Sequence, residues 1–416
     1  MQYLKWASAK GSQRFLINSV CMARFLIILI LIAPSHAGDR KDKASIIDSA
    51  VKASFERIGG RLLLIRESDG EFRYVDGGGL PAFSFDADPR GPLPQVTVPF
   101  AIDFGLSPIT DEGLKRLCGT PHLVAISLRG TRVTDAGVAQ LKDVSDLVSL
   151  DLTGTRISDD SLKSLAHLRY LSRLRLGWTN VTDSGLAALR QSQRMTLLEL
   201  SSTEVTGTGF AQLAHLPLST VVLSRDSTTD EGLRAIAGVR SLRNLSVSGK
   251  RITDRGIKEL VAIQNLGSLS LYNASVTDAS IVHLPTLKKL TECSVEFSRI
   301  TDVGLASFSE CAQLSTLNLR SSKFITGSGI RKLAKLQGLV DLNLSDTALT
   351  DDGLKGVEEL VHLRSLDLSY TFITDLSVDR LIILCSLQKL VVSRSRITEE
   401  GVARLRKSLP KCDIEN

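Results

Sequence analysis

Histidine is the residue type in this chain with the widest chemical repertoire, because imidazole ligates metals and transfers protons near neutral pH. The chain has six histidines. His167 and His215 share a register in a repeated pattern, but they lie two units apart, roughly 10 Å at the spacing of neighbouring strands. A zinc site needs three or four ligands on one ion. We therefore expect these histidines to lie in turns, with no metal and no cofactor bound.

Nucleophilic and redox chemistry are the next possibilities that the residue types raise. Cys293 takes the place of an inward-facing strand leucine, and no cysteine spacing typical of a disulfide framework is present. The sequence contains no GxSxG motif, no P-loop, no GxGxxG after a strand and no HExxH. An inserted catalytic loop would interrupt the repeat, whose length varies by a single residue. We therefore predict that the protein is not an enzyme.

Recognition of a partner is the remaining chemistry, and one group of side chains favours it. Arg and Trp are residue types that often anchor interfaces. Several of them lie close together in the pattern, with acidic residues beside them and a tyrosine further along. The alternative is an internal role, with ion pairs between neighbouring strands and Trp178 filling one rim. The predicted partner-binding residues are Arg129, Asp151, Arg173, Arg175, Trp178, Glu199 and Tyr272.

The elements that must position these residues follow from a phrase that occurs thirteen times. It consists of a β-branched or leucine residue, then Thr or Ser, usually Asp, and a small residue two places later. The first begins at Ile109 and the last at Ile397, with a spacing of 24 residues except for one of 23 and one of 25. A fixed period in this range is typical of a solenoid, in which each unit packs on its neighbours.

One unit, from Leu147 to Leu168, predicts a strand, a turn, a short helix and a return. Leu150 and Leu152 alternate with exposed positions as a strand requires, and later leucines follow helical spacing. The Thr or Ser of the phrase is suited to capping the helix, and the following Asp to the positive end of its dipole. The small residue is Gly in ten units and Ser in three. We interpret it as a steric requirement where adjacent coils pack closely.

The segments LVSLDLTGTRISDDSLKSL (147–165) and LVDLNLSDTALTDDGLKGV (339–357) resemble the leucine-rich repeat family. The phrase is similar to the cysteine-containing branch known from F-box receptor proteins and to 24-residue bacterial secreted repeats. The resemblance covers residues 96–416. It implies an α/β fold of about 13 repeats, a right-handed horseshoe with a parallel β-sheet on the concave face and short helices on the convex face. It transfers no catalytic residue.

The first 37 residues have the pattern of a secretory signal peptide. They contain four basic residues and no acid, an apolar run from Phe25 to Ala33, and small residues around Ala37. Nine apolar residues are too few for an ordinary transmembrane helix. We expect an exported protein, periplasmic, cell-surface or secreted. The alternative is a membrane anchor formed by the same segment if it is not cleaved, and Met22 is a second possible start.

Charge argues against a nucleic-acid partner. The chain has 51 basic and 45 acidic residues, a net charge of +6. Residues 1–37 contribute four of the basic residues, so the remainder has 47 basic and 45 acidic residues, or +2. A near-balanced chain lacks the basic excess that nucleic-acid binding requires.

Residues 38–95 do not follow the repeat and are predicted to form an N-terminal cap, with an independent domain as the alternative. Residues 45–58 suit an amphipathic helix, 61–65 and 71–75 a hairpin, and 77–94 a loop rich in Gly, Pro and Asp. Residues 96–416 are then the repeat domain. Near Ile414 the sequence resembles the start of a fourteenth strand.

The sequence thus predicts an exported scaffold without enzymatic activity that binds a protein or a glycan through its concave face. The concave strand positions are small and polar, without a large apolar stripe. We expect no small-molecule cofactor, membrane contact only through the N-terminal segment, and a monomer or weak self-association. The alternatives are an F-box-receptor-like substrate adaptor for protein ubiquitination, and a cell-surface structural protein that self-assembles through its C-terminal end.

Overall fold

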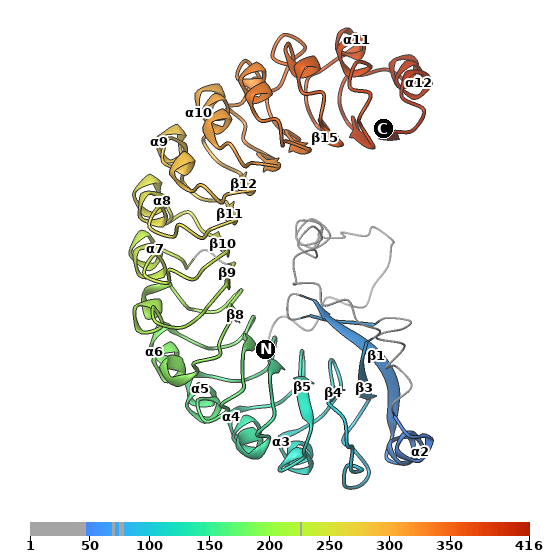
Figure 1. Cartoon of the computed structure of the whole chain (residues 1–416), viewed down its shortest axis with the longest axis vertical. Helices are drawn as coiled ribbons and strands as arrows, with labels where there is room; N and C mark the ends of the chain where they lie inside the picture. The colour runs from blue at the N-terminus through green and yellow to red at the C-terminus, as the bar shows by residue number, and fades with distance from the viewer. Residues whose placement is uncertain (1–46, 69–70, 75–78, 225–226) are drawn as a thin grey trace, which may run out of the picture.

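The computed structural model describes residues 47–68, 71–74, 79–224 and 227–416, which form an arc of repeated coils. The predicted signal peptide lies outside these residues. Short helices line the outer curve and strands line the inner curve (Figure 1). The fold is the predicted horseshoe solenoid.

The described strands belong to one seventeen-stranded sheet. They are β1 Gly60–Ser68, β2 Glu71–Tyr74, β3 Leu80–Phe85, β4 Phe100–Asp103, β5 Leu123–Ser127, β6 Ser149–Asp151, β7 Arg173–Arg175, β8 Leu197–Glu199, β9 Thr220–Leu223, β10 Asn244–Ser248, β11 Ser268–Tyr272, β12 Glu292–Glu296, β13 Thr316–Asn318, β14 Asp341–Asn343, β15 Ser365–Asp367, β16 Lys389–Val391 and β17 Asp413–Glu415.

The α-helices are short, and most begin at the Asp of the repeated phrase. They are α2 Ser49–Arg57, α3 Asp111–Leu114, α4 Asp135–Val138, α5 Asp159–Leu165, α6 Asp183–Leu186, α7 Asp230–Ile236, α8 Asp254–Leu260, α9 Asp278–Ile281, α10 Asp302–Ser307, α11 Val378–Leu381 and α12 Glu399–Ser408. The fifth, tenth and eleventh units have 3-10 helices instead, at Thr208–Gln212, Ile330–Lys335 and Val357–Glu359.

The antiparallel part of the sheet lies in the N-terminal cap. Strand β1 pairs antiparallel with β2 over residues 65–68 and with β3 over residues 60–65, so the predicted partner of residues 61–65 is replaced by β3 except at Ile65. Strand β3 then pairs parallel with β4, and each later strand to β17 pairs parallel with the next. The prediction of a loop over residues 77–94 was wrong where β3 lies, because Leu80–Phe85 joins the cap to the first repeat.

Aromatic packing joins the cap to the solenoid core. The rings of Phe55 on α2 and Phe83 on β3 stack with centroids 3.5 Å apart, and both contact Phe100 of β4 edge-on. All three side chains are fully buried, and they belong to the same hydrophobic cluster as the leucines of the repeats. At the other end Leu409 and Ile414 are also buried.

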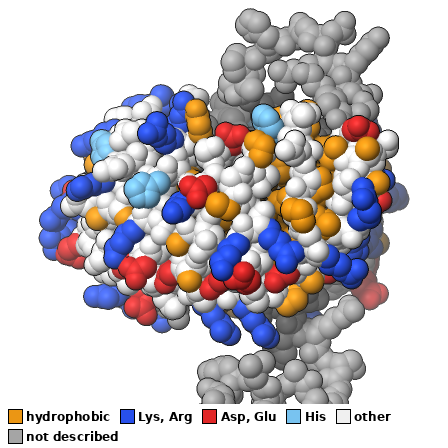
Figure 2. Space-filling model, turned by 90° about the horizontal axis from the view of Figure 1, so that it is seen from below, with side chains coloured by type: hydrophobic (Ala, Val, Ile, Leu, Met, Phe, Trp, Pro, Cys, Tyr) orange, Lys and Arg blue, Asp and Glu red, His pale blue; other side chains and the backbone are white. Residues whose placement is uncertain are grey.

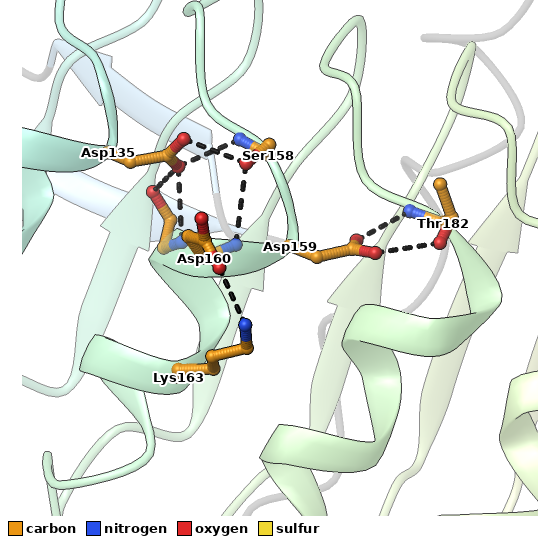
Figure 3. Close-up of polar contacts among 7 residues, drawn as sticks. Asp135, Ser158, Asp159, Asp160, Lys163 and Thr182 are labelled. Atoms are coloured by element: carbon orange, nitrogen blue, oxygen red, sulfur yellow. Dashed lines mark hydrogen bonds and ion pairs between the residues drawn. The ribbon is translucent and has the colours of Figure 1, made fainter.

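Consecutive units are joined by the Asp of one phrase and the Thr or Ser of the next. Asp135 accepts hydrogen bonds from the backbone N–H (2.8 Å) and the hydroxyl (2.7 Å) of Ser158, as Figure 3 shows. Asp159 does the same with Thr182. The hydroxyls of Ser158 and Thr182 also accept a hydrogen bond from the backbone N–H two residues further along, which confirms the predicted helix cap. The Asp column therefore links neighbouring units as well as facing a helix dipole.

The small residue of the phrase leaves room for that carboxylate. A Cβ atom on Gly137 or Gly185 would collide with the Oδ1 atom of the preceding unit's Asp. Neither glycine has a positive φ, so it is space and not backbone conformation that requires glycine there. Where the residue is Ser161, its N–H and hydroxyl both donate to Asp135. The steric interpretation of this column is confirmed, and the group that needs the space is the Asp side chain.

Three units lack the Asp, and the two of them that are followed by another unit use the backbone instead. Gly207 and Gly327 stand at its position, with φ of 99° and 109°. There the carbonyl oxygen of the preceding residue accepts the next unit's N–H: Thr206 from Thr229 at 3.2 Å, and Thr326 from Thr350 at 3.4 Å. A backbone carbonyl thus replaces a carboxylate at these two joints.

Within the part of the chain that the structure describes, no helix is long and apolar enough to cross a membrane.

Candidate binding surface on the concave face

The inner curve of the arc presents alternate residues of each strand. Asp151 of β6, Arg175 of β7 and Glu199 of β8 are register partners on three successive strands. Arg175 therefore lies between two acidic side chains, and its charge acts to lower the pKa of Glu199. This row matches the internal alternative more closely than a set of free anchors.

The two acids of the row have a further structural task. Asp151 accepts a hydrogen bond from the N–H of Thr153 at 2.9 Å, and Glu199 from the N–H of Ser201 at 2.8 Å. Asn343 and Asp367 do the same two residues before Ser345 and Ser369, at the end of other strands. Asp151 and Glu199 are 8% and 9% exposed, so little of either carboxylate reaches the surface.

Burial has an electrostatic consequence at Glu199. Loss of hydration raises its pKa above the usual value, although hydrogen bonds with Ser201 and the charge of Arg175 oppose the rise. Gly177 on the neighbouring unit accommodates the carboxylate, since a Cβ there would lie 2.8 Å from Glu199 Oε2. The carboxylate is held against its own sheet.

The cationic and aromatic members of the predicted site are more accessible. Arg129 is exposed, whereas Arg173 and Arg175 on β7 are half-buried. Trp178 lies just beyond β7, is 68% exposed, and has a φ of 57°. The backbone N–H of Trp178 donates to the carbonyl of Ser201 at 2.7 Å, which fixes the backbone there.

Tyr272 does not join this group. It ends β11, four strands further along than β7, or roughly 20 Å at the spacing of paired strands. Its ring lies edge-on against Phe297, with centroids 5.0 Å apart, and the two are 45% and 43% exposed. The predicted residues therefore divide between two places on the same curve.

A position missed by sequence reasoning connects these two places. In nearly every unit a residue one to three places beyond the strand has a positive φ, and before the last unit the backbone N–H of this residue donates to the next unit. Such backbone normally favours Gly, Asn or Asp. Gly130, Gly154, Ser202, Gly249, Asn273, Ser321, Asp346 and Arg394 occupy it in most units, but Leu106, Trp178, Phe297 and Tyr370 occupy it in four. The signal was available in the glycines of the early units.

A second set of acids was also missed. Glu292 on β12 and Asp341 on β14 lie two strands apart on one register column. Burial raises the pKa of Glu292, with a hydrogen bond to Ser268 opposing it and the charge of Asp341 adding to it. Burial likewise raises the pKa of Asp341.

Metal binding finds no support in the described residues, where no three His, Cys, Asp or Glu side chains group around a common point.

Comparison with known proteins identifies the repeats. The family model described as Leucine Rich repeat matches residues 145–166, 167–189 and 337–357. These ranges include the whole of both segments on which the resemblance was based, so the chain carries leucine-rich repeats. No curated protein matches the sequence.

Several solved structures are similar to this chain at low identity. An internalin of Listeria monocytogenes has a TM-score of 0.50 and 19% identity, with 80% of this chain and 86% of the internalin covered. A leucine-rich repeat protein of Leptospira interrogans has 0.47 and 19%, covering 76% and 89%. A plant peptide hormone receptor, solved as a complex, has 0.43 and 14%, covering 79% and 65%. At 19% identity the internalin speaks for the fold alone.

Proposed function

We propose that the protein is an exported scaffold without enzymatic activity that binds another protein along its concave face. One observation carries this proposal: Leu106, Trp178, Phe297 and Tyr370 are bulky, exposed side chains on backbone of positive φ. Each such residue costs on the order of 1–3 kcal/mol and persists where it serves a purpose. An exposed Trp or Tyr gains little from its own fold, so contact with a partner is the purpose that fits.

The geometry of the sheet supports the same conclusion. Strands β4 to β16 are thirteen parallel neighbours, which at about 4.8 Å each give a surface roughly 60 Å long. That length suffices for a protein interface of ordinary size. Arg129 and Trp178 supply the residue types that interfaces favour. The side chains next to them are small and polar, so they leave room for a partner on the surface.

Capture from an extract of the source organism tests the binding surface. Immobilised residues 38–416 should retain a protein, and a Trp178→Asn variant should retain roughly tenfold less, because interface anchors of this type are often worth more than 1 kcal/mol. Arg394→Asn is the matched control, since Arg394 has a φ of 59° at the equivalent place of the last unit. Equal capture by the two variants would contradict the proposed surface.

Export rests on the basic flank, apolar run and small residues of positions 1–37. N-terminal sequencing of the protein recovered outside the cytoplasm should find a chain that starts close to Gly38. A full-length protein in the cytoplasm would instead favour the intracellular adaptor.

A further inference from the structure

The segments that return from the convex helices to the strands carry an uneven charge. In six consecutive units these segments are residues 166–172, 190–196, 214–219, 237–243, 261–267 and 285–291, which we call the return face. They contain no Asp or Glu. Their seven basic residues are Arg169, Arg190, Arg194, Arg240, Arg243, Lys288 and Lys289.

The charges of these residues are not neutralised within the fold. All seven are exposed, and in the described part of the chain none of them forms an ion pair. Their contacts go to uncharged groups instead: Lys289 Nζ donates to Asn265 Oδ1 at 2.7 Å, and the Arg194 guanidinium lies 4.8 Å from the centre of the Tyr170 ring. Lys335, on a later unit, is by contrast paired with Glu310 at 2.8 Å. The return face therefore keeps a positive field.

The opposite side of the same six units shows that this is a property of one face. Residues 155–160, 179–184, 203–208, 227–231, 250–255 and 274–279 contain eight acidic and four basic residues. The positive field is thus directional, although the whole chain is close to balance.

The return face is also equipped for hydroxyl groups. Gln191, Gln193 and Gln264 are exposed between the basic residues, and each amide can donate and accept hydrogen bonds. A partner that carries both negative charge and many hydroxyls would use both kinds of side chain.

A shallow hollow adjoins the start of this face, between α5 and α6. Ala166, Ala187 and Ala188 line it, with Lys163, His167 and Arg190 among its polar neighbours, and its volume is about 490 Å³. Asp159 also lines it, but this carboxylate is bound to Thr182. Lys, Arg and His side chains gather at the upper left of Figure 2, on the side where α5 and α6 lie in Figure 1. A hollow of this size can hold one or two rings of a ligand, but not a helix or a strand of a partner protein.

We propose that the return face binds a linear acidic polysaccharide, with carboxylate or sulfate groups on the basic residues and hydroxyls on the amides. The basic residues form groups in the third and fourth, sixth and eighth units, so a flexible chain that follows the arc can reach them all. A flat anionic membrane fits less well, because the flanking return segments carry Asp143, Asp146 and Glu310 on the same side. This surface is separate from the concave face of the proposed function.

The test compares two variants with the same loss of charge. The first replaces Arg190, Arg194, Arg240 and Lys288 by Gln. The second replaces Arg132, Arg156, Arg251 and Arg299 by Gln, all exposed on the opposite side of the coil. Binding to immobilised heparin and to polygalacturonate is measured at about physiological ionic strength, with dextran as the neutral polymer and phosphatidylserine vesicles as the membrane. Far-ultraviolet circular dichroism confirms that both variants fold.

We expect the native chain to bind at least one acidic polysaccharide and not dextran. The first variant should bind roughly tenfold or more weakly, the loss expected when several exposed charge contacts are removed together. The second variant should bind within about twofold of the native chain. Equal weakening of the two variants would reduce the effect to net charge and overturn the proposal. Binding to vesicles without binding to either polysaccharide would overturn it in favour of a membrane.

Discussion

The carboxylate of Asp159 receives both the backbone N–H and the hydroxyl of Thr182, 23 residues further along the chain, at 2.8 Å each. This pair of bonds is repeated along the solenoid. The Asp of one unit therefore fixes the position of the Thr or Ser at which the next unit's helix begins. Several consequences can be measured.

Removing the carboxylate should weaken the joint between the third and fourth units. Asp159→Ala leaves the N–H of Thr182 without its charged acceptor, so we expect a loss of roughly 1–3 kcal/mol in the free energy of unfolding. Asp160→Ala is the control, since Asp160 makes an exposed pair with Lys163 that should contribute little to stability. Urea unfolding followed by circular dichroism measures both. Similar midpoints for the two variants would contradict the structural role.

The small-residue column should distinguish Ala from Ser. A Cβ at Gly185 collides with Asp159, so Gly185→Ala should cost about 1–3 kcal/mol. Gly185→Ser adds the same Cβ but also a hydroxyl, which at Ser161 donates to the equivalent Asp at 2.5 Å. The Ser variant should therefore unfold at a higher urea concentration than the Ala variant. The reverse order would show that the Ser units depend on a different backbone.

Stability should fall in acid, with a measurable share from single Asp residues. Burial acts to raise the pKa of Asp135, but hydrogen bonds from Ser158 and Ser161 outweigh it and the pKa is lowered. A carboxylate with a lowered pKa stabilises the fold above its unfolded pKa of about 3.9, and this contribution is lost as the pH falls through the folded value. An Asp135→Asn variant should lose less stability than the native chain between neutral pH and about pH 3. If the stability of the native chain and of the variant fell by the same amount over this pH range, Asp135 would not contribute to the acid sensitivity.

Glu199 should behave in the opposite sense. Its pKa is raised by burial, so the fold favours the protonated form more than the unfolded chain does, and that contribution to stability is lost as the pH rises through the folded value. We expect Glu199→Gln to stabilise the protein at neutral pH, since an amide oxygen can still accept from the N–H of Ser201. The gain should disappear near pH 4, where unfolded glutamate takes up its proton. Destabilisation at neutral pH would show that the pairing with Arg175 outweighs the cost of burial.

Trp178 should cost stability where it stands. Asn tolerates positive φ better than Trp, so Trp178→Asn should leave stability unchanged or raise it by about 0.5–1 kcal/mol. Thermal unfolding checks this. A marked loss of stability would mean that Trp178 belongs to the fold and would weaken its assignment to a partner.

Patterns within one unit were enough to predict the horseshoe. The spacing from Ile109 to Ile397 predicts strand, turn and helix, and the Thr or Ser of the phrase predicts the caps found at Thr134 and Ser158. The strand at Leu80–Phe85 could not be predicted, because Pro81 and the surrounding Gly and Asp residues are typical of a loop. Pro81 lies opposite Leu64 of β1 and ahead of Ala82, where pairing with β4 begins, so its missing N–H removes no bond to β4.

The candidate site was less predictable because its determinants cross between units. Asp151 and Glu199 are polar residues on a concave strand, which indicates exposure, yet each accepts an N–H at its strand end and is buried. Trp178 gives no local sign of a left-handed backbone, which the adjacent coils impose through the bond to Ser201. The assignment of these residues to partner binding stays a prediction.

The carbonyl groups of Thr206 and Thr326, which replace Asp at two joints, make the solenoid chemically uneven along its length. A peptide oxygen takes up no proton in the range where a carboxylate does, so acid weakens the joints formed by Asp135 and Asp351, whose pKa values are lowered by their hydrogen bonds, while these two keep their acceptor. Hydrogen exchange at about pH 3 should therefore show faster exchange at Ser158 or Thr374 than at Thr229 or Thr350. We therefore expect local unfolding in acid to divide the solenoid into groups of units, with two joints whose acceptors are not protonated.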